Sequence, residues 1–527
     1  MKTPNLQRLP LGRSSFSAIR KDNCLYVDKT EYAYSLITQG YRYFLSRPRR
    51  FGKSLFVSTL KEILEGNKQL FNGLWIEKSD YQWHQYGVIV LDFSAIKAAN
   101  PDSLSHGICA LLQNIANNYE LNLTLDKGDA EHALLTLVEV LYKNFGRVVV
   151  LVDEYDSPIL KHLNKSELAG EMRDTIRSFF AAIKSHDEQI SFVFITGVSS
   201  FAKAGLFSGL NNLQIMTLDE KWATICGYTD QEIDHYFAPH IQAWADKENI
   251  SYGDLRSQIK DWYNGYRFGA VATPVYNPFS FMSAINMQEY ENFWFATGTP
   301  TFLIKELEKV HRSSEMRLLE LESIEITKAI LGSFDVGKIP LSALMFQTGY
   351  LTITSFNKEE QAYRLGYPNY EVRTAAQKYL LAIYTNSDIE AIDQFSLKLI
   401  VALKQKNIFE VVELIKSQFA RVAYSSLMNE ERFYHGMMQM LFGVVGLKVC
   451  SEIMTSQGRI DMLVELPAVN YILELKFNQS AQKALAQIEE RKYYDALRYQ
   501  NKPIVLLGLN FKRKAKEFEI TYAAKEM

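Results

Sequence analysis

The chain has little of what marks a secreted or membrane-spanning protein. Only four of its 527 residues are cysteine, scattered singly without CxxC or Cys/His spacing: Cys24, Cys109, Cys226 and Cys450. Such usage argues against a disulfide framework and a zinc site, and favours buried, reduced thiols. The longest apolar runs, such as Val148 to Val152, are far shorter than the roughly 18 residues that span a bilayer. Because the N-terminal stretch also lacks an apolar signal segment, we expect a cytoplasmic protein with no membrane partner.

The chain also lacks an excess of charge of either sign. Its 58 lysines and arginines nearly cancel 60 aspartates and glutamates, which leaves a net charge of -2. Nothing therefore drives the chain as a whole toward nucleic acid, and any such binding must be local. A basic run near the C-terminus, Lys512–Lys514 with Lys516, is by itself more typical of a solvated surface than of a phosphate-binding track.

Apolar residues are plentiful, at 47% hydrophobic and 13% aromatic, and there is no internal repeat or low-complexity tract. This composition excludes a disordered chain. A length of 527 residues exceeds what one hydrophobic core usually supports, so we expect two to four domains of roughly 100 to 200 residues.

From about residue 28 to 225, apolar strands alternate with amphipathic helices, which predicts a doubly wound parallel α/β sheet. The unbroken apolar character of the strands fits strands covered by helices on both faces. We expect strands at 41–46, 88–92, 147–153 and 190–196, and helices at 53–65, 102–120 and 130–144.

Downstream, the pattern changes three times. Residues 226–330 are mostly helical, 331–385 suggest a small hairpin or winged subdomain, and 386–395 look like a linker. The last segment predicts a compact α/β unit with a helix at 428–442, strands at 447–454, 459–466, 470–477 and 503–509, and a helix at 480–498. The predicted domains are therefore 1–225, 226–330 (a helical lid), 331–385 and 386–527.

The sequence RPRRFGKS, Arg47 to Ser54, has the spacing of a phosphate-binding loop. Such a loop follows a strand, and its backbone N–H groups and a helix N-terminus face the phosphates. Gly52 would allow the tight turn, Lys53 would bind the β- and γ-phosphate oxygens, and Ser54 would supply a hydroxyl to Mg²⁺. The first glycine of the usual pattern is replaced by Arg47, so an ordinary helix N-terminus remains the alternative.

A second strand favours the nucleotide-binding interpretation. The apolar run Val148 to Val152 ends in Asp153 and Glu154, as the acidic strand of a P-loop ATPase requires. We expect Asp153 to hold Mg²⁺ and Glu154 to orient or deprotonate the attacking water. The alternative is a solvated strand end.

RPRRFGKS, VDEYDSPI and ITGVSSFAKAGLFSGLNNL, with YNGYRF, TGTP and QTGYLTI further on, resemble the AAA-ATPase-like family of bacterial proteins, which is related to archaeal-type P-loop ATPases. The resemblance implies a P-loop NTPase fold with ATP and Mg²⁺ as cofactors, and Arg47 is the usual residue in this family. It also places Thr196 where such ATPases sense the γ-phosphate, although Thr196 could equally cap its strand.

The remaining phosphate charge could be met by one or more nearby cations. Arg50, within the loop, is a candidate for nucleotide binding, and the others are Arg49, Lys203 and Arg267. Each taken singly is more typical of a surface or structural cation.

A carboxylate–carboxylate–lysine set lies near the C-terminus. Asp461 follows the turn GRI, and Glu474 and Lys476 are two apart on the next expected strand, so they share a face. Hard oxygen ligands suit Mg²⁺, and we expect the carboxylates to bind metal and Lys476 to stabilise the charge that develops during phosphodiester cleavage. An exposed strand face is the alternative, but charges within an apolar strand are costly unless they are paired or bound to an ion.

This segment resembles a PD-(D/E)XK nuclease domain, although Ile460 replaces the proline of the family name. The resemblance implies that Glu431, or adjacent Glu430, is the acidic residue of the first helix and a further metal ligand. It makes Gln487 and Tyr494, seven residues apart on one face of the following helix, auxiliary residues. His435 is either structural or placed near the metal.

Together these features predict an ATP-binding and ATP-hydrolysing protein coupled to a Mg²⁺-dependent nuclease acting on DNA or RNA, with defence and genome maintenance as settings to consider. An ATP-dependent regulatory switch is the alternative, in which the C-terminal domain binds a partner or nucleic acid without cleaving it. A purely structural adaptor would not need Lys53, Ser54 and Asp153 at matched spacing. Assembly into a homo-oligomer is left open by the sequence.

Overall fold

The computed structural model describes residues 6–201, 205–207, 210, 212–294, 307, 324–332, 340–422, 431–446, 448–455, 458–514 and 517–527. The chain divides into two compact units, Met1–Glu306 with Ser323–Glu371, and Leu307–Glu322 with Val372–Met527. This division is coarser than the four predicted domains, whose boundaries stay predictions. In the part of the chain that is described, no helix has the length and apolar character needed to cross a bilayer.

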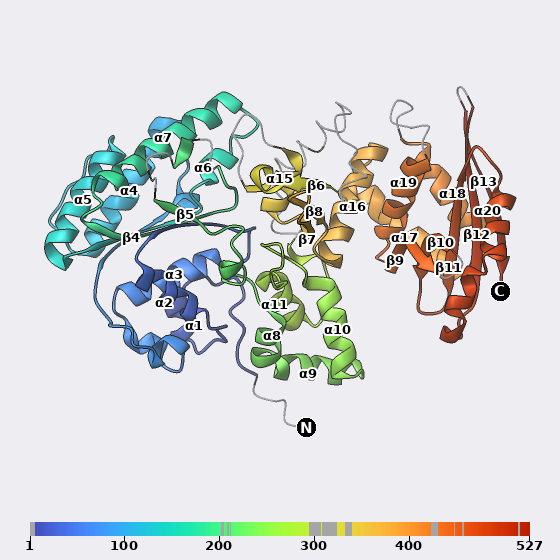
Figure 1. The fold of residues 1–527 in the computed structure, drawn as a ribbon, viewed down its shortest axis with the longest axis horizontal. Helices are drawn as coiled ribbons and strands as arrows, with labels where there is room; N and C mark the ends of the chain where they lie inside the picture. The colour runs from blue at the N-terminus through green and yellow to red at the C-terminus, as the bar shows by residue number, and fades with distance from the viewer. Residues whose placement is uncertain are drawn as a thin grey trace. The chain divides into compact units, whose positions relative to one another are not determined.

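The N-terminal unit is built on a five-stranded sheet in the order β2-β3-β4-β1-β5, with every neighbouring pair parallel. All residues of β1 and β3 are buried. Helices α1–α3 lie on one face and α4, α5 and α7 on the other, so the predicted doubly wound sheet is confirmed (Figure 1). The strands are β1 Arg42–Ser46, β2 Gly87–Asp92, β3 Val148–Asp153, β4 Ile190–Gly197 and β5 Leu213–Ile215.

Helix positions in this unit follow local signals. Helix α4 begins where Asn100 and Ser103 form a capping box and Pro101 takes the first helical position. Strand β5 was not predicted, because three residues are too few for a periodic pattern. The helices are α1 Phe16–Lys21, α2 Thr30–Gln39, α3 Lys53–Leu64, α4 Pro101–Asn118, α5 Ala130–Phe145, α6 Ser157–Leu160 and α7 Ser166–Ser185.

Strand order decides which residues meet. Because β4 lies between β1 and β3, it pairs Thr196 with Leu45 on one side and Ile195 with Val152 on the other. The carboxyl ends of β1, β4 and β3 therefore come together at one edge of the sheet, where ligands bind in open α/β folds.

After β5, the described part of this unit continues with helices and then a small sheet. Four helices pack around a common apolar cluster that includes Ile233, Trp244, Ile259 and Phe281. They are α8 Asp230–Tyr236, α9 Ala238–Glu248, α10 Tyr252–Tyr263 and α11 Pro278–Met287. A three-stranded sheet follows in the order β6-β8-β7, and its strands β7 and β8 form the predicted hairpin. The elements of this region are β6 Glu325–Thr327, α14 Lys328–Gly332, α15 Leu341–Thr348, β7 Thr352–Asn357 and β8 Ala362–Gly366.

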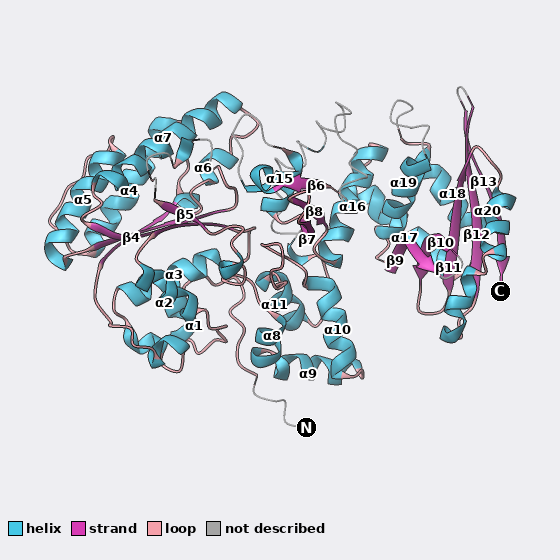
Figure 2. Ribbon diagram, viewed as in Figure 1, coloured by secondary structure: helices cyan, strands magenta, loops and turns pink. Residues whose placement is uncertain are grey.

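The C-terminal unit has a five-stranded mixed sheet in the order β13-β12-β11-β10-β9, in which only β11 and β12 are parallel. Figure 2 shows its helices and strands. The elements are α16 Tyr370–Thr385, α17 Ile389–Lys404, α18 Ile408–Phe419, α19 Glu431–Gly443, β9 Lys448–Thr455, β10 Gly458–Glu465, β11 Asn470–Phe477, α20 Ala481–Glu490, β12 Ile504–Lys514 and β13 Glu517–Glu526.

Three elements of this unit have bounds that differ from those predicted. The linker at 386–395 shrinks to residues 386–388, because the Asp388 side chain accepts the N–H of Ala391 and caps α17. The helix predicted at 480–498 ends at Glu490, where Lys492 takes a positive φ of 48° and a short 3₁₀ helix, Tyr493–Gln500, follows. The strand predicted at 503–509 continues as β12 to Lys514 and pairs with β13. Strand β13 itself was not predicted.

Candidate functional site

The phosphate loop connects β1 to α3. Gly52 has a φ of +94°, and a Cβ atom built there would meet nothing within 4 Å, so glycine is needed for backbone conformation and leaves open space beside the loop. Lys53 is the first residue of α3 and is 4% exposed. Its ammonium donates to the carbonyl oxygens of Arg47 and Pro48, both at 3.0 Å. The first N–H groups of α3, including that of Ser54, have no acceptor within the helix.

Arg47 is not a phosphate ligand in this arrangement. Its guanidinium is 1% exposed and donates to the carbonyl oxygens of Ser46, Thr217 and Trp222 at 2.9, 2.9 and 3.0 Å. It also lies 4.0 Å from the ring centroid of Phe268, and burial lowers the pKa of Arg47 to about 10. The residue that replaces the usual glycine is thus a buried cation that anchors the loop, a role that sequence reasoning missed.

Three further contacts hold the loop. Phe51 packs edge-on against Tyr266 and Phe268, with ring centroids 4.8 and 5.6 Å apart. The carbonyl oxygen of Arg49 accepts the indole N–H of Trp294 at 3.2 Å. The YNGYRF motif therefore contributes the aromatic support of the phosphate loop.

Asp153 ends β3 and Thr196 lies near the end of β4, as predicted. Both are buried, and the Thr196 hydroxyl donates to Asp153 Oδ1. The same oxygen accepts the N–H of Glu154 at 3.1 Å. Glu154 takes a positive φ of 49°, a conformation that non-glycine residues rarely adopt and that is concentrated at functional sites.

The residues after Glu154 organise the loop that follows β4. The buried Asp156 carboxylate accepts the N–H groups of Val198 and Ser199, and the Tyr155 hydroxyl donates to the Ser199 carbonyl oxygen at 2.9 Å. Burial raises the pKa of Asp156 to about 6, and the charge of Glu154 adds to the rise. Tyr155 and Asp156 were not singled out from the sequence, although the polar stretch VDEYDSPI directly after an apolar strand was the available signal.

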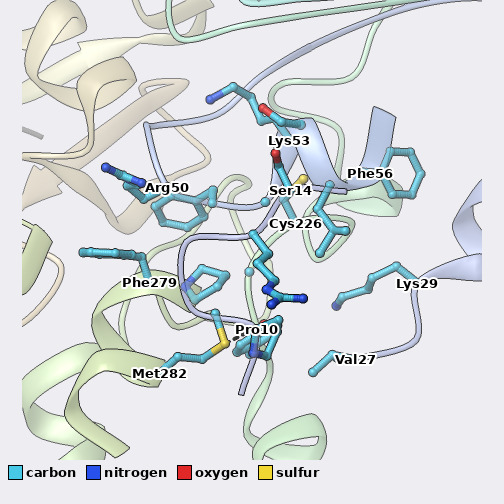
Figure 3. Close-up of a pocket in the computed structure, with 18 of the residues that line it drawn as sticks. Pro10, Ser14, Val27, Lys29, Arg50, Lys53, Phe56, Cys226, Phe279 and Met282 are labelled. Atoms are coloured by element: carbon cyan, nitrogen blue, oxygen red, sulfur yellow. Dashed lines mark hydrogen bonds between the residues drawn. The ribbon is translucent and has the colours of Figure 1, made fainter. Parts of the chain in front are cut away.

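A cavity of about 420 Å³ opens beside the phosphate loop, a size typical of small-molecule sites. Figure 3 shows Lys53 at its top and Pro10, Val27 and Met282 at its bottom. Its polar lining includes Arg50, Lys53, Ser54 and Glu154, whereas Asp153 and Thr196 are not among its lining residues. Its apolar lining includes Leu25, Val27, Ile225, Phe279 and Met282.

The candidate cations differ in position. Arg49 and Arg50 line the cavity, and the Arg50 guanidinium lies 4.7 Å from the ring centroid of Phe279. Arg267 is not among the lining residues, and its guanidinium donates to the Thr354 carbonyl oxygen at 3.3 Å. Lys203 lies outside the described residues.

The second site lies where β10 and β11 separate. Their pairing ends at Met462 opposite Leu473, so the next opposing residues, Asp461 and Glu474, are not part of the ladder. Instead, the Asp461 carboxylate accepts the backbone N–H of Leu475 at 2.9 Å. This separation lets the two carboxylates lie together at the end of the paired segment.

Glu474 is the most electrostatically perturbed group of this site. It is 1% exposed, and its Oε1 accepts from the Lys476 ammonium at 2.8 Å. Its Oε2 is buried without a hydrogen-bond partner. Burial raises the pKa of Glu474 to about 7, with the charges of Asp461 and Glu431 adding to the rise and Lys476 opposing it. The hydrogen bond between Lys476 and Glu474 shows that their side chains share a face of β11, as predicted.

Helix α19 adds two residues beside these carboxylates. The Nε2 atom of His435 lies 3.7 Å from Glu431 Oε1 and 3.7 Å from Asp461 Oδ2. Glu430 lies outside the described residues. Across the ranges that the structure describes, no group of three or more His, Cys, Asp and Glu side chains is already arranged to hold a metal ion.

The two auxiliary residues are on different elements. Gln487 is on α20, whereas Tyr494 is on the 3₁₀ helix Tyr493–Gln500. The prediction that one helix face carries both was therefore wrong. Lys492 has the left-handed conformation that ends the helix between them. Tyr494 packs against an apolar cluster that includes Ile488 of α20 and Ile472 of β11, and the Arg498 guanidinium lies 5.2 Å from its ring centroid.

Comparison with known proteins agrees with this geometry. Residues 10–207 match the family model of the predicted AAA-ATPases, and residues 429–519 match that of the PD-(D/E)XK nuclease superfamily. The chain is 37% identical over 524 residues, 97% of both chains, to the protein of Azotobacter chroococcum mcd 1 named "Uncharacterized protein in vnfD 5'region".

Two solved structures are similar at low identity. The Walker-type ATPase of Pyrococcus abyssi is 10% identical with a TM-score of 0.37, covering 69% of this chain and 99% of its own. The Aeropyrum pernix ORC1 protein in complex with DNA is 11% identical with a TM-score of 0.24, covering 66% and 91%. The family models and the relative of full length confirm the predicted resemblance: the chain belongs to the predicted AAA-ATPase family and carries a C-terminal domain of the PD-(D/E)XK nuclease superfamily.

Proposed function

We propose that the chain binds and hydrolyses ATP in the N-terminal cavity and that this activity is coupled to Mg²⁺-dependent cleavage of DNA or RNA by the C-terminal unit. The observation that carries the nuclease half is the buried, unpartnered Oε2 of Glu474 beside Asp461 and Lys476. A buried carboxylate oxygen without a donor is costly, and a bound cation would remove that cost.

The N-terminal residues fit an ATP site. The cavity of about 420 Å³ joins an apolar part to the helix N-terminus at Lys53, where N–H groups and the lysine attract phosphate. In binding, the Lys53 ammonium would exchange the Arg47 and Pro48 carbonyl oxygens for phosphate oxygens. Arg50 would line the same site.

Magnesium fits the same edge of the sheet, because the hydroxyl of Ser54 and the carboxylate of Asp153 are the oxygen ligands that this ion prefers. When bound, Mg²⁺ supplies charge neutralisation to the transferring phosphate. The Thr196 hydroxyl, already on Asp153, would sense the γ-phosphate, and Glu154 would orient or deprotonate water.

In the C-terminal unit, Glu431, Asp461 and Glu474 would hold Mg²⁺. Two carboxylates suffice for this ion because it keeps several of its waters, so an assembled three-residue group is not required. When bound, the ion supplies Lewis-acid stabilisation and an activated water. Lys476 would stabilise the charge developing on the scissile phosphate, with Gln487 on α20 and Tyr494 on the 3₁₀ helix that follows as auxiliary residues.

The test uses the full-length protein with single- and double-stranded DNA and RNA, with Mg²⁺ or Mn²⁺, and with and without ATP. Metal-dependent cleavage that changes with ATP supports the proposal. Lys53→Ala should lose ATP hydrolysis, because it removes the strongest charge-assisted contact to phosphate. ATP hydrolysis without cleavage of any nucleic acid would instead support the regulatory switch, in which the C-terminal unit only binds.

A further inference from the structure

The loop after β4 is held in an unusual way. Four consecutive backbone N–H groups, those of residues 198 to 201, each donate to a side-chain acceptor. Asp156 accepts the first two, and the Tyr155 hydroxyl accepts that of Phe201 at 3.1 Å. Since this loop begins two residues after Thr196, these acceptors determine how the end of β4 is held beside Asp153.

The remaining acceptor comes from a distant part of the unit. The N–H of Ser200 donates to Gln347 Oε1 at 2.7 Å, and Gln347 Nε2 donates to the Leu331 carbonyl oxygen at 3.2 Å. Gln347 lies on α15 and is 3% exposed. Both ends of its amide are used, so its orientation is fixed.

The same helix also contacts the phosphate loop. Gly349, which ends α15, has a φ of +91°, and a Cβ built there would lie 2.8 Å from the Cβ of Pro48 and 3.3 Å from the ring of Trp294. The indole N–H of Trp294 is bonded to the carbonyl oxygen of Arg49. Residues 347–349 therefore contact both the loop after β4 and the loop that holds Lys53.

We propose that Gln347 is a positioning residue for ATP hydrolysis, which sets the loop after Thr196 relative to the phosphate loop and acts on turnover rather than on nucleotide affinity. Gln347 does not line the cavity, so its substitution leaves the binding contacts in place. Misplacement of catalytic groups by about 1 Å lowers turnover on the order of a hundredfold. This inference rests on the ATPase activity proposed above.

The experiment compares three variants of the full chain by ATP turnover and by nucleotide affinity. Gln347→Met keeps the shape of the side chain but removes both hydrogen bonds, and should lower kcat by about ten- to a hundredfold with affinity nearly unchanged. Gln347→Glu keeps an acceptor for the Ser200 N–H but loses the donor to the Leu331 carbonyl oxygen, and should recover part of kcat. The matched control is Gln418→Met, which replaces a buried glutamine of the other unit, the C-terminal one, and should turn over ATP like the wild type.

The outcomes separate the two proposals. A wild-type protein that hydrolyses no ATP contradicts the ATPase proposal itself. With an active wild type, equal kcat in Gln347→Met, or an equal loss of kcat and affinity, overturns the positioning role. If Gln347→Met fails to fold, Gln347→Glu decides: a partial loss of kcat at unchanged affinity supports the role, and either wild-type kcat or an equal loss of kcat and affinity contradicts it.

Discussion

In the N-terminal unit the buried Lys53 and Asp153 of the proposed ATP site have hydrogen-bond partners within the protein, whereas in the C-terminal unit the buried Oε2 of Glu474 has none. Lys53 donates to two carbonyl oxygens, and Asp153 accepts from Thr196. Glu474 instead accepts from Lys476 at Oε1 only, lies near the charges of Asp461 and Glu431, and keeps Oε2 unpartnered. The two sites thus differ in what a ligand must replace.

This difference has a physical consequence. A nucleotide that enters the first site exchanges existing hydrogen bonds for new ones. The buried groups there are therefore already hydrogen-bonded without a nucleotide. A cation entering the second site supplies a partner that the buried Glu474 Oε2 otherwise lacks. We therefore expect ligand removal to change stability more at the second site than at the first.

The largest expected effect tests the second site. Asp461→Asn should lower metal-dependent cleavage by about 10³-fold or more, because lost metal contacts remove several kcal/mol of transition-state stabilisation. Lys476→Ala should also abolish cleavage but largely preserve metal binding, since it removes a cation rather than a ligand. Nuclease assays and metal titration measure the two effects. The exposed Asp495→Asn is the control, and ATPase activity should survive in all three.

A comparable loss is expected in the first site, but only in turnover. Glu154→Gln should still bind ATP and hydrolyse it roughly 10²- to 10⁴-fold more slowly, the usual range for loss of a general base. Single-turnover kinetics with a separate binding measurement distinguishes the two steps. Loss of binding would assign Glu154 a structural or metal role, and Glu167→Gln on α7 is the matched control.

Arg47→Gly restores the usual first glycine of a phosphate loop, yet it should lower the free energy of unfolding. It leaves the buried carbonyl oxygens of Ser46, Thr217 and Trp222 without this donor, at a cost of about 3 kcal/mol. Denaturant unfolding of the N-terminal unit measures this loss. The stability of Arg47→Lys should lie between that of Arg47→Gly and that of the wild type. A glycine variant of unchanged stability would contradict the anchoring role.

The smallest effect is the pH dependence of the C-terminal unit without metal. Glu474 has an ordinary pKa of 4.5 and a folded pKa raised to about 7. Between these values the folded state keeps a proton that the unfolded state has lost, so the free energy of unfolding falls as pH rises through this window. Thermal unfolding from pH 5 to 8 should show this decline.

Two additions sharpen that measurement. Mg²⁺ should raise the unfolding temperature most at pH 8, where it binds the ionised carboxylates, and chelation should reverse the gain. Glu474→Gln should flatten the pH dependence and remove the Mg²⁺ effect. A decline that persists in Glu474→Gln would assign it to another group.

The sequence alone determined the elements whose signals are local. The strands that precede Lys53 and Glu154, the helix after Gly52, and the strand carrying Glu474 and Lys476 all followed from apolar periodicity interrupted by charged or glycine residues. These patterns report backbone period and burial within a few residues. The resemblance to two families was also legible in them.

Only the tertiary structure decided which distant residues meet. The insertion of β4 between β1 and β3 brings Thr196 to Asp153, and the separation of β10 from β11 brings Asp461 to Glu474. The buried Arg47 guanidinium donates hydrogen bonds to carbonyl oxygens some 170 residues away in sequence. Gln347 accepts a hydrogen bond from Ser200, which is 147 residues away. No local pattern encodes such pairs, because their free energy depends on strand order and on packing between segments far apart in the chain.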